Sequence, residues 1–157
     1  MTSVRRIQCE AKKDLKAAPA TLAPVDSLKA VVSPNACPEA IASLPGSHFD
    51  VVLDLTHWLT MGMEQQRMPV LMSGGAFYTL STDGGNVAVF PTTGTLRRGG
   101  FAFPENTEKL LRGSSLITQE SVGRGNLVMF ANEPMFRGFW RALDRVVLNA
   151  MLVGSGR

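Results

Sequence analysis

The sequence predicts an α/β domain in which a mixed, strand-rich sheet is followed by a long helix near the carboxy terminus. Three observations lead to this expectation. Short apolar runs separated by glycine and proline recur between residues 47 and 131, as in strands joined by turns. The run at residues 127–131 lacks polar alternation, which is typical of a strand covered on both faces. Apolar residues then recur at helical spacing between residues 136 and 151.

Composition excludes several classes of protein. The chain has 157 residues, of which 45% are hydrophobic and 18% charged, which favours one domain over a disordered chain. No stretch of 18 consecutive apolar residues is present, so we expect no transmembrane helix. The net charge of +3 is a weak indication of nucleic-acid binding, and no basic surface interleaved with aromatic residues stands out. We therefore expect neither a membrane nor a nucleic acid as a partner.

Residues 1–46 differ in pattern from the rest, and we expect a loosely ordered arm there. Prolines recur along this segment, and prolines at such spacing interrupt helices and do not fit central strands. One or two short helices are expected, one of them near residues 38–44. The arm is either a docking tail or, as we favour, a linker. Residues 47–157 are expected to form one α/β domain.

The amino-terminal sequence also bears on the compartment. Charged residues follow the basic start where a signal peptide needs an apolar stretch, so no signal peptide is predicted. Cys9 and Cys37 form no C-x-x-C pair, and two free thiols are favoured over a disulfide bond between them. These features leave the compartment open.

The first half of the expected domain reads as strands joined by turns. Residues 49–53 predict a strand, and residues 54–59 a turn into a short element that Gly62 ends. Further strands are predicted over residues 69–72, 76–80 and 86–90. The sequence Asp83-Gly84-Gly85 is a turn signal between the last two of these runs.

A short helix is predicted at residues 105–111, at the start of the second half. Pro104 precedes this segment and Gly113 follows it, which is typical of the two ends of a helix. A strand is then expected over residues 116–122. The sequence Gly123-Arg124-Gly125 predicts a tight hairpin turn into the apolar run that ends at Ala131.

The last predicted element is the long helix. Asn132 can cap it, with Glu133 and Pro134 favourable in its first turn. We expect its apolar stripe to pack on the strand that contains Phe130, and Gly154 to end it. The stripe consists of Phe136, Trp140, Leu143, Val147, Ala150 and Met151.

Motifs for chemistry are scarce. Neither His48 nor His57 lies in a zinc-binding motif, and no Cys/His cluster has the spacing of metal ligands. The sequence contains no G-x-S-x-G nucleophile elbow and no phosphate-binding loop. We therefore expect no metal site and no cofactor.

The arginines are the remaining candidates for binding. Arg137, Arg141 and Arg145 recur at i, i+4 and i+8 on one face of the predicted helix. With Arg97-Arg98 and Arg124 they could bind an anion or an acidic partner. The alternative, which we favour, is an ordinary solvated face balanced by nearby acidic residues.

Two segments carry a resemblance to a known family. Residues 123–140 read Gly-Arg-Gly-Asn-Leu-Val-Met-Phe-Ala-Asn-Glu-Pro-Met-Phe-Arg-Gly-Phe-Trp and continue to Leu148-Asn149-Ala150. This stretch closely resembles the carboxy-terminal end of certain bacterial zinc carboxypeptidase-like proteins. In those proteins a domain similar to the class I glutamine amidotransferase fold follows the peptidase domain. The sequence His57-Trp58-Leu59-Thr60-Met61-Gly62 is similar to the family's H-x-L-x-x-G segment.

The resemblance covers roughly residues 49–153 and implies an exported parent protein. The family's zinc-binding H-x-x-E motif and the amidotransferase nucleophile are both missing, so no catalytic residue carries over. We therefore expect a non-catalytic accessory or interaction domain whose partner is a peptidase domain or another protein. The alternative is a small hydrolase or amidotransferase-like enzyme in which His57, Asp54 and Glu133 are the acid/base groups.

Overall fold

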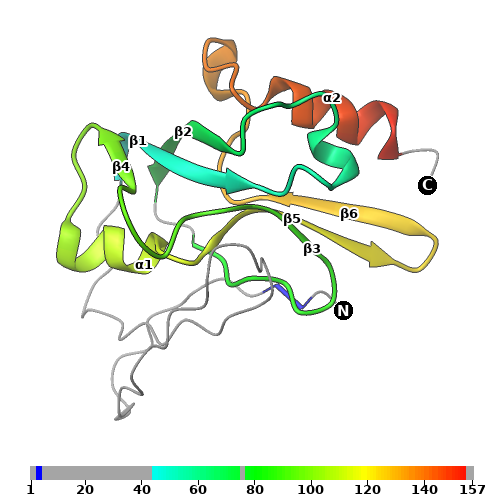
Figure 1. Ribbon diagram of the computed structural model, residues 1–157, viewed down its shortest axis with the longest axis horizontal. Helices are drawn as coiled ribbons and strands as arrows, with labels where there is room; N and C mark the ends of the chain where they lie inside the picture. Colours follow the sequence, from blue (N-terminus) through cyan, green and yellow to red (C-terminus); the bar gives the residue numbers. More distant parts are fainter. Residues whose placement is uncertain (1–2, 5–43, 75–76, 155–157) are drawn as a thin grey trace.

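The computed structural model describes residues 3–4, 44–74 and 77–154 (Figure 1). Most of the arm predicted at residues 1–46 lies outside these ranges, as do Cys9, Cys37 and nearly all of the helix predicted near residues 38–44. Within the described part, the first strand already begins at Leu44, so it includes the last residues assigned to the arm.

The strand-rich α/β fold is confirmed, and its sheet is antiparallel rather than mixed. The order is β2-β1-β3-β5-β6, with β4 also paired to β1, and each of these pairs is antiparallel. The strands β5 and β6 are joined directly by the turn at residues 123–124, whereas longer segments separate the strands of the other pairs. The strands are β1 (Leu44–Leu53), β2 (Arg67–Gly74), β3 (Gly85–Val89), β4 (Arg97–Gly99), β5 (Ser115–Val122) and β6 (Gly125–Phe130).

The sheet curls, so that the segment after β6 reaches β2 at the other end of the strand order. The side-chain amide of Asn132 donates to the carbonyl oxygen of Leu71 in β2 at 2.8 Å. The residue predicted to cap a helix therefore joins two distant strands instead.

Most of the predicted strands are confirmed. Residues 49–53, 69–72 and 116–122 lie within β1, β2 and β5, and residues 86–89 of the run 86–90 lie in β3. The tight hairpin turn is also confirmed, because Val122 pairs with Gly125 and Gly123 has a φ of +61°. The strand predicted at residues 76–80 is wrong, since its described part makes only an isolated bridge from Tyr78 to Ser115.

The expectation that residues 127–131 form a strand covered on both faces is wrong. They lie largely in β6, which pairs with β5 alone among the named strands and stands at the end of the strand order. Leu127 is 36% exposed, and the following residues are half-buried. An uninterrupted apolar run can also form a partly exposed edge strand, because periodicity alone does not report burial on the second face.

The helix predicted at residues 105–111 is confirmed as a π-helical turn, η2 (Pro104–Glu108), that leads into α1 (Lys109–Leu111). The turn predicted from residue 54 leads into a 3₁₀ helix, η1 (Trp58–Thr60), as expected. Gly62 follows this helix with a φ of +77°, a left-handed conformation that favours glycine.

The long terminal helix is the largest error of the sequence analysis. The helix α2 spans only Asp144–Leu152, and residues 136–138 form a separate 3₁₀ turn, η3 (Phe136–Gly138). Arg137 and Gly138 have φ values of +51° and +71°, which a right-handed helix does not accept. The apolar stripe is therefore also wrong in part, because Val146 is fully buried and Met151 is 70% exposed.

The helix α2 packs on η1 rather than standing alone above the sheet (Figure 1). The side-chain amide of Asn149 donates to the carbonyl oxygens of Leu59 at 2.8 Å and Met61 at 3.0 Å. Leu143 and Val146 join the hydrophobic core, in which the rings of Phe49 and Phe90 meet edge to face at 6.4 Å.

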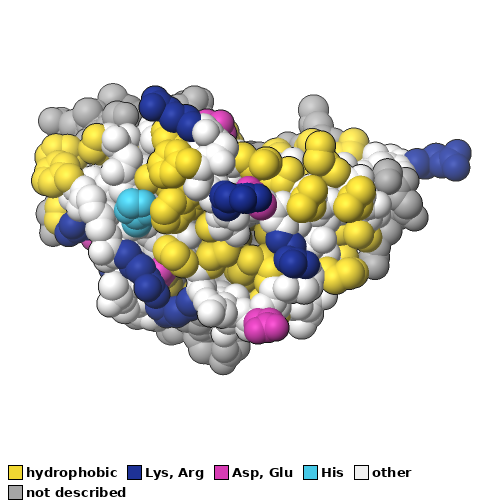
Figure 2. All heavy atoms as spheres, turned by 90° about the horizontal axis from the view of Figure 1, so that it is seen from above, with side chains coloured by type: hydrophobic (Ala, Val, Ile, Leu, Met, Phe, Trp, Pro, Cys, Tyr) yellow, Lys and Arg dark blue, Asp and Glu magenta, His cyan; other side chains and the backbone are white. Residues whose placement is uncertain are grey.

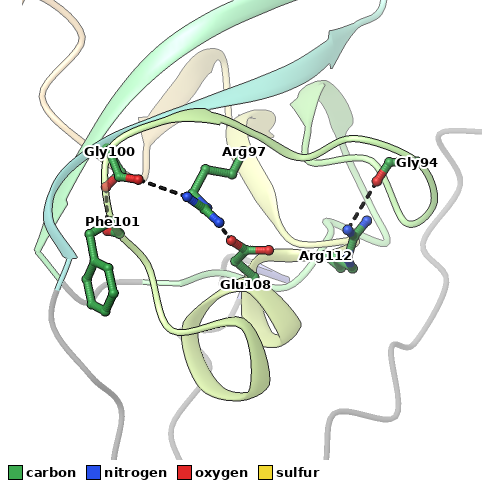
Figure 3. Close-up of polar contacts among 7 residues, drawn as sticks. Gly94, Arg97, Gly100, Phe101, Glu108 and Arg112 are labelled. Atoms are coloured by element: carbon green, nitrogen blue, oxygen red, sulfur yellow. Dashed lines mark hydrogen bonds and ion pairs between the residues drawn. The ribbon is translucent and has the colours of Figure 1, made fainter.

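Polar contacts hold the connection between β4 and α1 against the sheet (Figure 3). The guanidinium of Arg97 pairs with Glu108 at 2.5 Å and donates to the carbonyl oxygen of Gly100 at 2.9 Å. Arg112 donates to the carbonyl oxygen of Gly94 at 3.1 Å. Arg97 therefore ties this connection to β4, and Arg112 ties the end of α1 to the loop that precedes β4.

Candidate functional site

Two of the three candidate acid/base residues lie in one turn after β1. An oxygen of the Asp54 carboxylate accepts hydrogen bonds from the backbone amide of Thr56 at 2.9 Å and its hydroxyl at 2.6 Å. The Nδ1 atom of His57 accepts from the backbone amide of Leu59 at 3.2 Å and so caps η1. Both side chains therefore help to shape the turn that leads into η1.

The third candidate, Glu133, lies in a different part of the fold. It follows Asn132, which is hydrogen-bonded to Leu71, and Leu71 pairs with His48 in β1. Asp54 follows His48 by six residues, and at the rise of a strand this separation is about 20 Å. The structure brings Asp54 and His57 together and leaves Glu133 apart from them.

The three arginines predicted on one helical face do not share a helix. Arg137 lies in η3, where its guanidinium sits 5.0 Å from the ring centre of Phe136. Arg141 precedes α2 and pairs with Asp144 at 2.9 Å, while Arg145 lies in the first turn of α2. The predicted stripe is wrong because Gly138 and the left-handed Arg137 interrupt the helix.

The Arg97-Arg98 pair serves the fold. Arg97 pairs with Glu108, and Arg98 pairs with Asp50 at 2.5 Å. The Asp50 side chain is only 4% exposed, so Arg98 neutralises a buried carboxylate on β1. Neither guanidinium is left free of carboxylates to bind an added anion.

Removal of the Arg98 side chain is expected to destabilise the protein. Arg98→Ala should lower the free energy of unfolding by about 2 kcal/mol, because it leaves a buried carboxylate unpaired while more than half of the Arg98 side chain is exposed. Urea unfolding at neutral pH measures this change. Arg137→Ala is the control and should change stability by no more than about 0.5 kcal/mol. Equal effects of the two substitutions would contradict a structural role for Arg98.

A cleft lies between α2 and the loop after η1. It has a volume of about 660 Å³ and is open to solvent. Its wall combines apolar and charged side chains, and a Cβ atom placed on Gly62 would stand 2.6 Å from Nη1 of Arg145. The residues that line it include Met63, Met68, Arg141, Arg145, Leu148 and Leu152.

The outer face of α2 extends this cleft with exposed apolar side chains. Leu148, Met151 and Leu152 are 54%, 70% and 76% exposed, and their spacing places them on one face of the helix. We call these three residues the α2 ridge. Met61, which is 53% exposed, is tied to α2 by the hydrogen bond from Asn149. Figure 2 shows the molecule from this side, where hydrophobic side chains gather with basic side chains among them.

A buried carboxylate that the sequence analysis missed lies on β5. Glu120 is 4% exposed and accepts hydrogen bonds from Ser81 and Ser3. A glutamate in the middle of a predicted strand was a signal for such a site. Its partner Ser3 lies 117 residues away in sequence, and no local pattern connects the two.

These contacts set the ionisation of Glu120. Burial alone raises the pKa of this carboxyl, but the hydrogen bonds from Ser3, Ser81 and Val4 outweigh burial and leave the pKa below its ordinary value. A lowered pKa in the folded state means that the stabilisation is complete above the ordinary carboxyl pKa. It is lost as the pH falls through the lowered value.

Acidification should therefore weaken the protein through Glu120. We expect the difference in unfolding free energy between the wild type and Glu120→Gln to be largest at neutral pH and to shrink as the solution is made acidic. Urea unfolding of both proteins from neutral to strongly acidic pH measures this difference. A gap that stays constant over this range would contradict the lowered pKa.

We also searched the described residues for clusters of metal ligands and for membrane-spanning helices. Within residues 3–4, 44–74 and 77–154, no group of three or more His, Cys, Asp or Glu side chains could hold a metal ion. No helix in these same ranges is long and apolar enough to cross a membrane.

Comparisons with known proteins add no relative. No family model matches the chain, and no curated protein and no solved structure is significantly similar to it.

Proposed function

We propose that this chain is a non-catalytic interaction domain that binds a protein partner through the α2 ridge and the adjoining cleft. The observation that supports this function best is the exposure of the ridge. Three large apolar side chains on one helical face are each more than half exposed, and Met61 adds a fourth beside them. Burial of each such side chain in a complex would contribute about 1 kcal/mol or more.

The charges of the cleft indicate the chemistry of the partner. The cleft is lined by two arginines and two carboxylates. Arg141 is paired with Asp144, whereas Arg145 and Glu64 form no ion pair within the described part of the chain. A matching surface would present apolar side chains to the ridge and a carboxylate to Arg145. We infer that the partner is a peptidase domain, since the resemblance to zinc carboxypeptidase-like proteins implies one. The likeness to the class I glutamine amidotransferase fold stays a prediction from the sequence.

A small hydrolase or amidotransferase-like enzyme is the second candidate, and the closeness of Asp54 and His57 in one turn favours it. The known contacts of both groups shape that turn, and Glu133 is distant from them. The test is hydrolysis of glutamine and of carboxy-terminal peptide bonds, with and without zinc. We expect no turnover above that of the His57→Ala variant. If the wild type hydrolyses either substrate and the His57→Ala variant does not, the chain is an enzyme and the proposed interaction function is wrong.

Charges placed on the ridge should abolish binding. The probe is a purified zinc carboxypeptidase domain from a bacterial protein of the resembled family, titrated with the full chain in a calorimeter. Leu148→Glu combined with Leu152→Glu should weaken binding at least tenfold, because carboxylates would be desolvated in an apolar contact (about 1.4 kcal/mol or more). Both positions are exposed, so the substitutions leave the core intact.

The matched control is Val122→Glu at the β5–β6 hairpin, where the replaced side chain is 50% exposed. It adds a carboxylate to another exposed apolar position and should leave the affinity unchanged. Failure of the wild-type chain to bind the peptidase domain would rule out this partner. Equal weakening by the control would rule out the ridge as the contact.

A further inference from the structure

The amino-terminal residues Ser3 and Val4 contact the turn before β3 and the Glu120 carboxylate on β5, which together we call the Glu120 site. The backbone amide of Ser3 donates to both carboxylate oxygens of Glu120, each at 3.0 Å. The backbone amide of Val4 also hydrogen-bonds to this carboxylate. One buried carboxylate thus binds two consecutive backbone amides, as a peptide-binding site does.

The hydroxyl of Ser3 is recognised separately. It donates to Glu120 and accepts from the backbone amides of Thr82 at 3.1 Å and Asp83 at 3.4 Å. It also lies 2.8 Å from the hydroxyl of Ser81. Alanine at position 3 would leave these donors without their acceptor, so the Glu120 site selects a hydroxyl as well as a backbone amide.

Hydrogen bonds within the folded domain hold the residues of the Glu120 site in place. The hydroxyl of Ser81 donates to Glu120 at 2.7 Å and accepts from the backbone amide of Gly84 at 2.8 Å. The backbone of Ser81 exchanges two hydrogen bonds with the side-chain amide of Asn86, at 2.8 and 3.0 Å. Ser81 is 2% exposed and Asn86 6%, which fixes the turn before any segment binds.

We propose that Glu120, Ser81 and the amides of Thr82 and Asp83 form a binding site for a peptide segment that carries a serine. In this structure the chain's own Ser3–Val4 occupies the site. The ligand class is set by three contacts: a free backbone N–H at the serine, its hydroxyl, and a second N–H at the next residue. Proline at the first of these positions cannot bind, because it lacks the N–H.

The first test follows the segment within the full chain. Amide hydrogen exchange of Ser3 and Val4, read by NMR, should be slowed at least about tenfold relative to an unstructured peptide, because both amides donate to a buried carboxylate. Glu120→Gln should remove most of this protection, and the exposed Glu133→Gln should leave it unchanged. Unprotected amides in the wild type, or protection unaffected by Glu120→Gln, would overturn the proposal.

The second test uses a substitution that removes the chain's own segment from the site and leaves the core unchanged. Ser3→Pro of the full chain removes one N–H from a partly exposed position, and the acetylated, amidated peptide Thr-Ser-Val-Arg is then added at millimolar concentration. We expect shifts of the Thr82 and Asp83 amide resonances with this peptide and none with Thr-Ala-Val-Arg. The absence of shifts, or equal shifts with both peptides, would overturn the proposal. This second test does not depend on Glu120→Gln folding.

Discussion

Gly84→Ala is expected to lower the free energy of unfolding by about 3 kcal/mol, because the new methyl group has no space. A Cβ atom at position 84 would stand 2.1 Å from the carbonyl oxygen of Gln119 and 2.7 Å from Cγ of Glu120. The first of these atoms belongs to the backbone of β5 and cannot move aside as a flexible side chain would. The turn before β3 and the strand β5 must therefore separate.

Gly125→Ala is the matched control for this substitution. Gly125 begins β6, and the nearest atom to a Cβ placed there is the carbonyl oxygen of Val122 at 3.8 Å, an ordinary contact. We expect a change of no more than about 0.5 kcal/mol in urea unfolding. If both alanines had the same effect, the close approach of the Gly84 turn to β5 would be contradicted.

Phe90→Ala is expected to cost about 4 kcal/mol, at the upper end of what truncation of one side chain produces. Phe90 is fully buried directly after β3, where its ring packs edge to face on Phe49. Its backbone also joins the next segment, because its amide donates to Ser114 and its carbonyl oxygen accepts from Gly113. The alanine keeps these two hydrogen bonds and leaves a cavity at the centre of the core.

Phe101→Ala provides the comparison for Phe90→Ala. The ring of Phe101 is 56% exposed, so its loss removes little buried area and should change stability by about 0.5 kcal/mol or less. Thermal and urea unfolding of both variants measure the difference. Similar losses from the two substitutions would mean that the core is not centred on Phe49 and Phe90.

The strands could be predicted where local pattern and burial agree. Residues 49–53 are apolar and flanked by turns, and they form the central part of β1. The hairpin at Gly123-Arg124 was predictable as well, because a two-residue turn needs glycine at a left-handed position. The direction of the strands was less accessible, since pairing depends on contacts between residues far apart in sequence.

The terminal helix is shorter than the spacing of its apolar residues predicts. Phe136 and Trp140 continue the helical spacing of Leu143 upstream. The left-handed Arg137 and Gly138 end the short turn that contains Phe136, and Trp140 lies outside any helix before α2 begins at Asp144. The Trp140 ring instead lies 4.7 Å from the ring of His48 on β1, a long-range contact that overrides local propensity. The arginine stripe depended on this helix and is wrong for the same reason.

The α2 ridge could not be predicted from the sequence, because the length and the packing of the terminal helix were predicted wrongly. The sequence predicts Met151 in an apolar stripe that packs on the sheet, whereas α2 packs on η1 and leaves Met151 exposed. Asp54 and His57 lie together as their closeness in sequence suggests. The distance of Glu133 from them depends on the curl of the sheet, which no local pattern encodes.

The most direct measurement of the proposed function is amide hydrogen exchange of the full chain with and without the peptidase domain. We predict slower exchange on binding, concentrated in α2 and in residues 61–65, which line the cleft or lie beside the α2 ridge. The Leu148→Glu, Leu152→Glu double variant should show no such change. Unaltered exchange in α2, or protection confined to the β5–β6 hairpin, would contradict an interaction domain that binds through this surface.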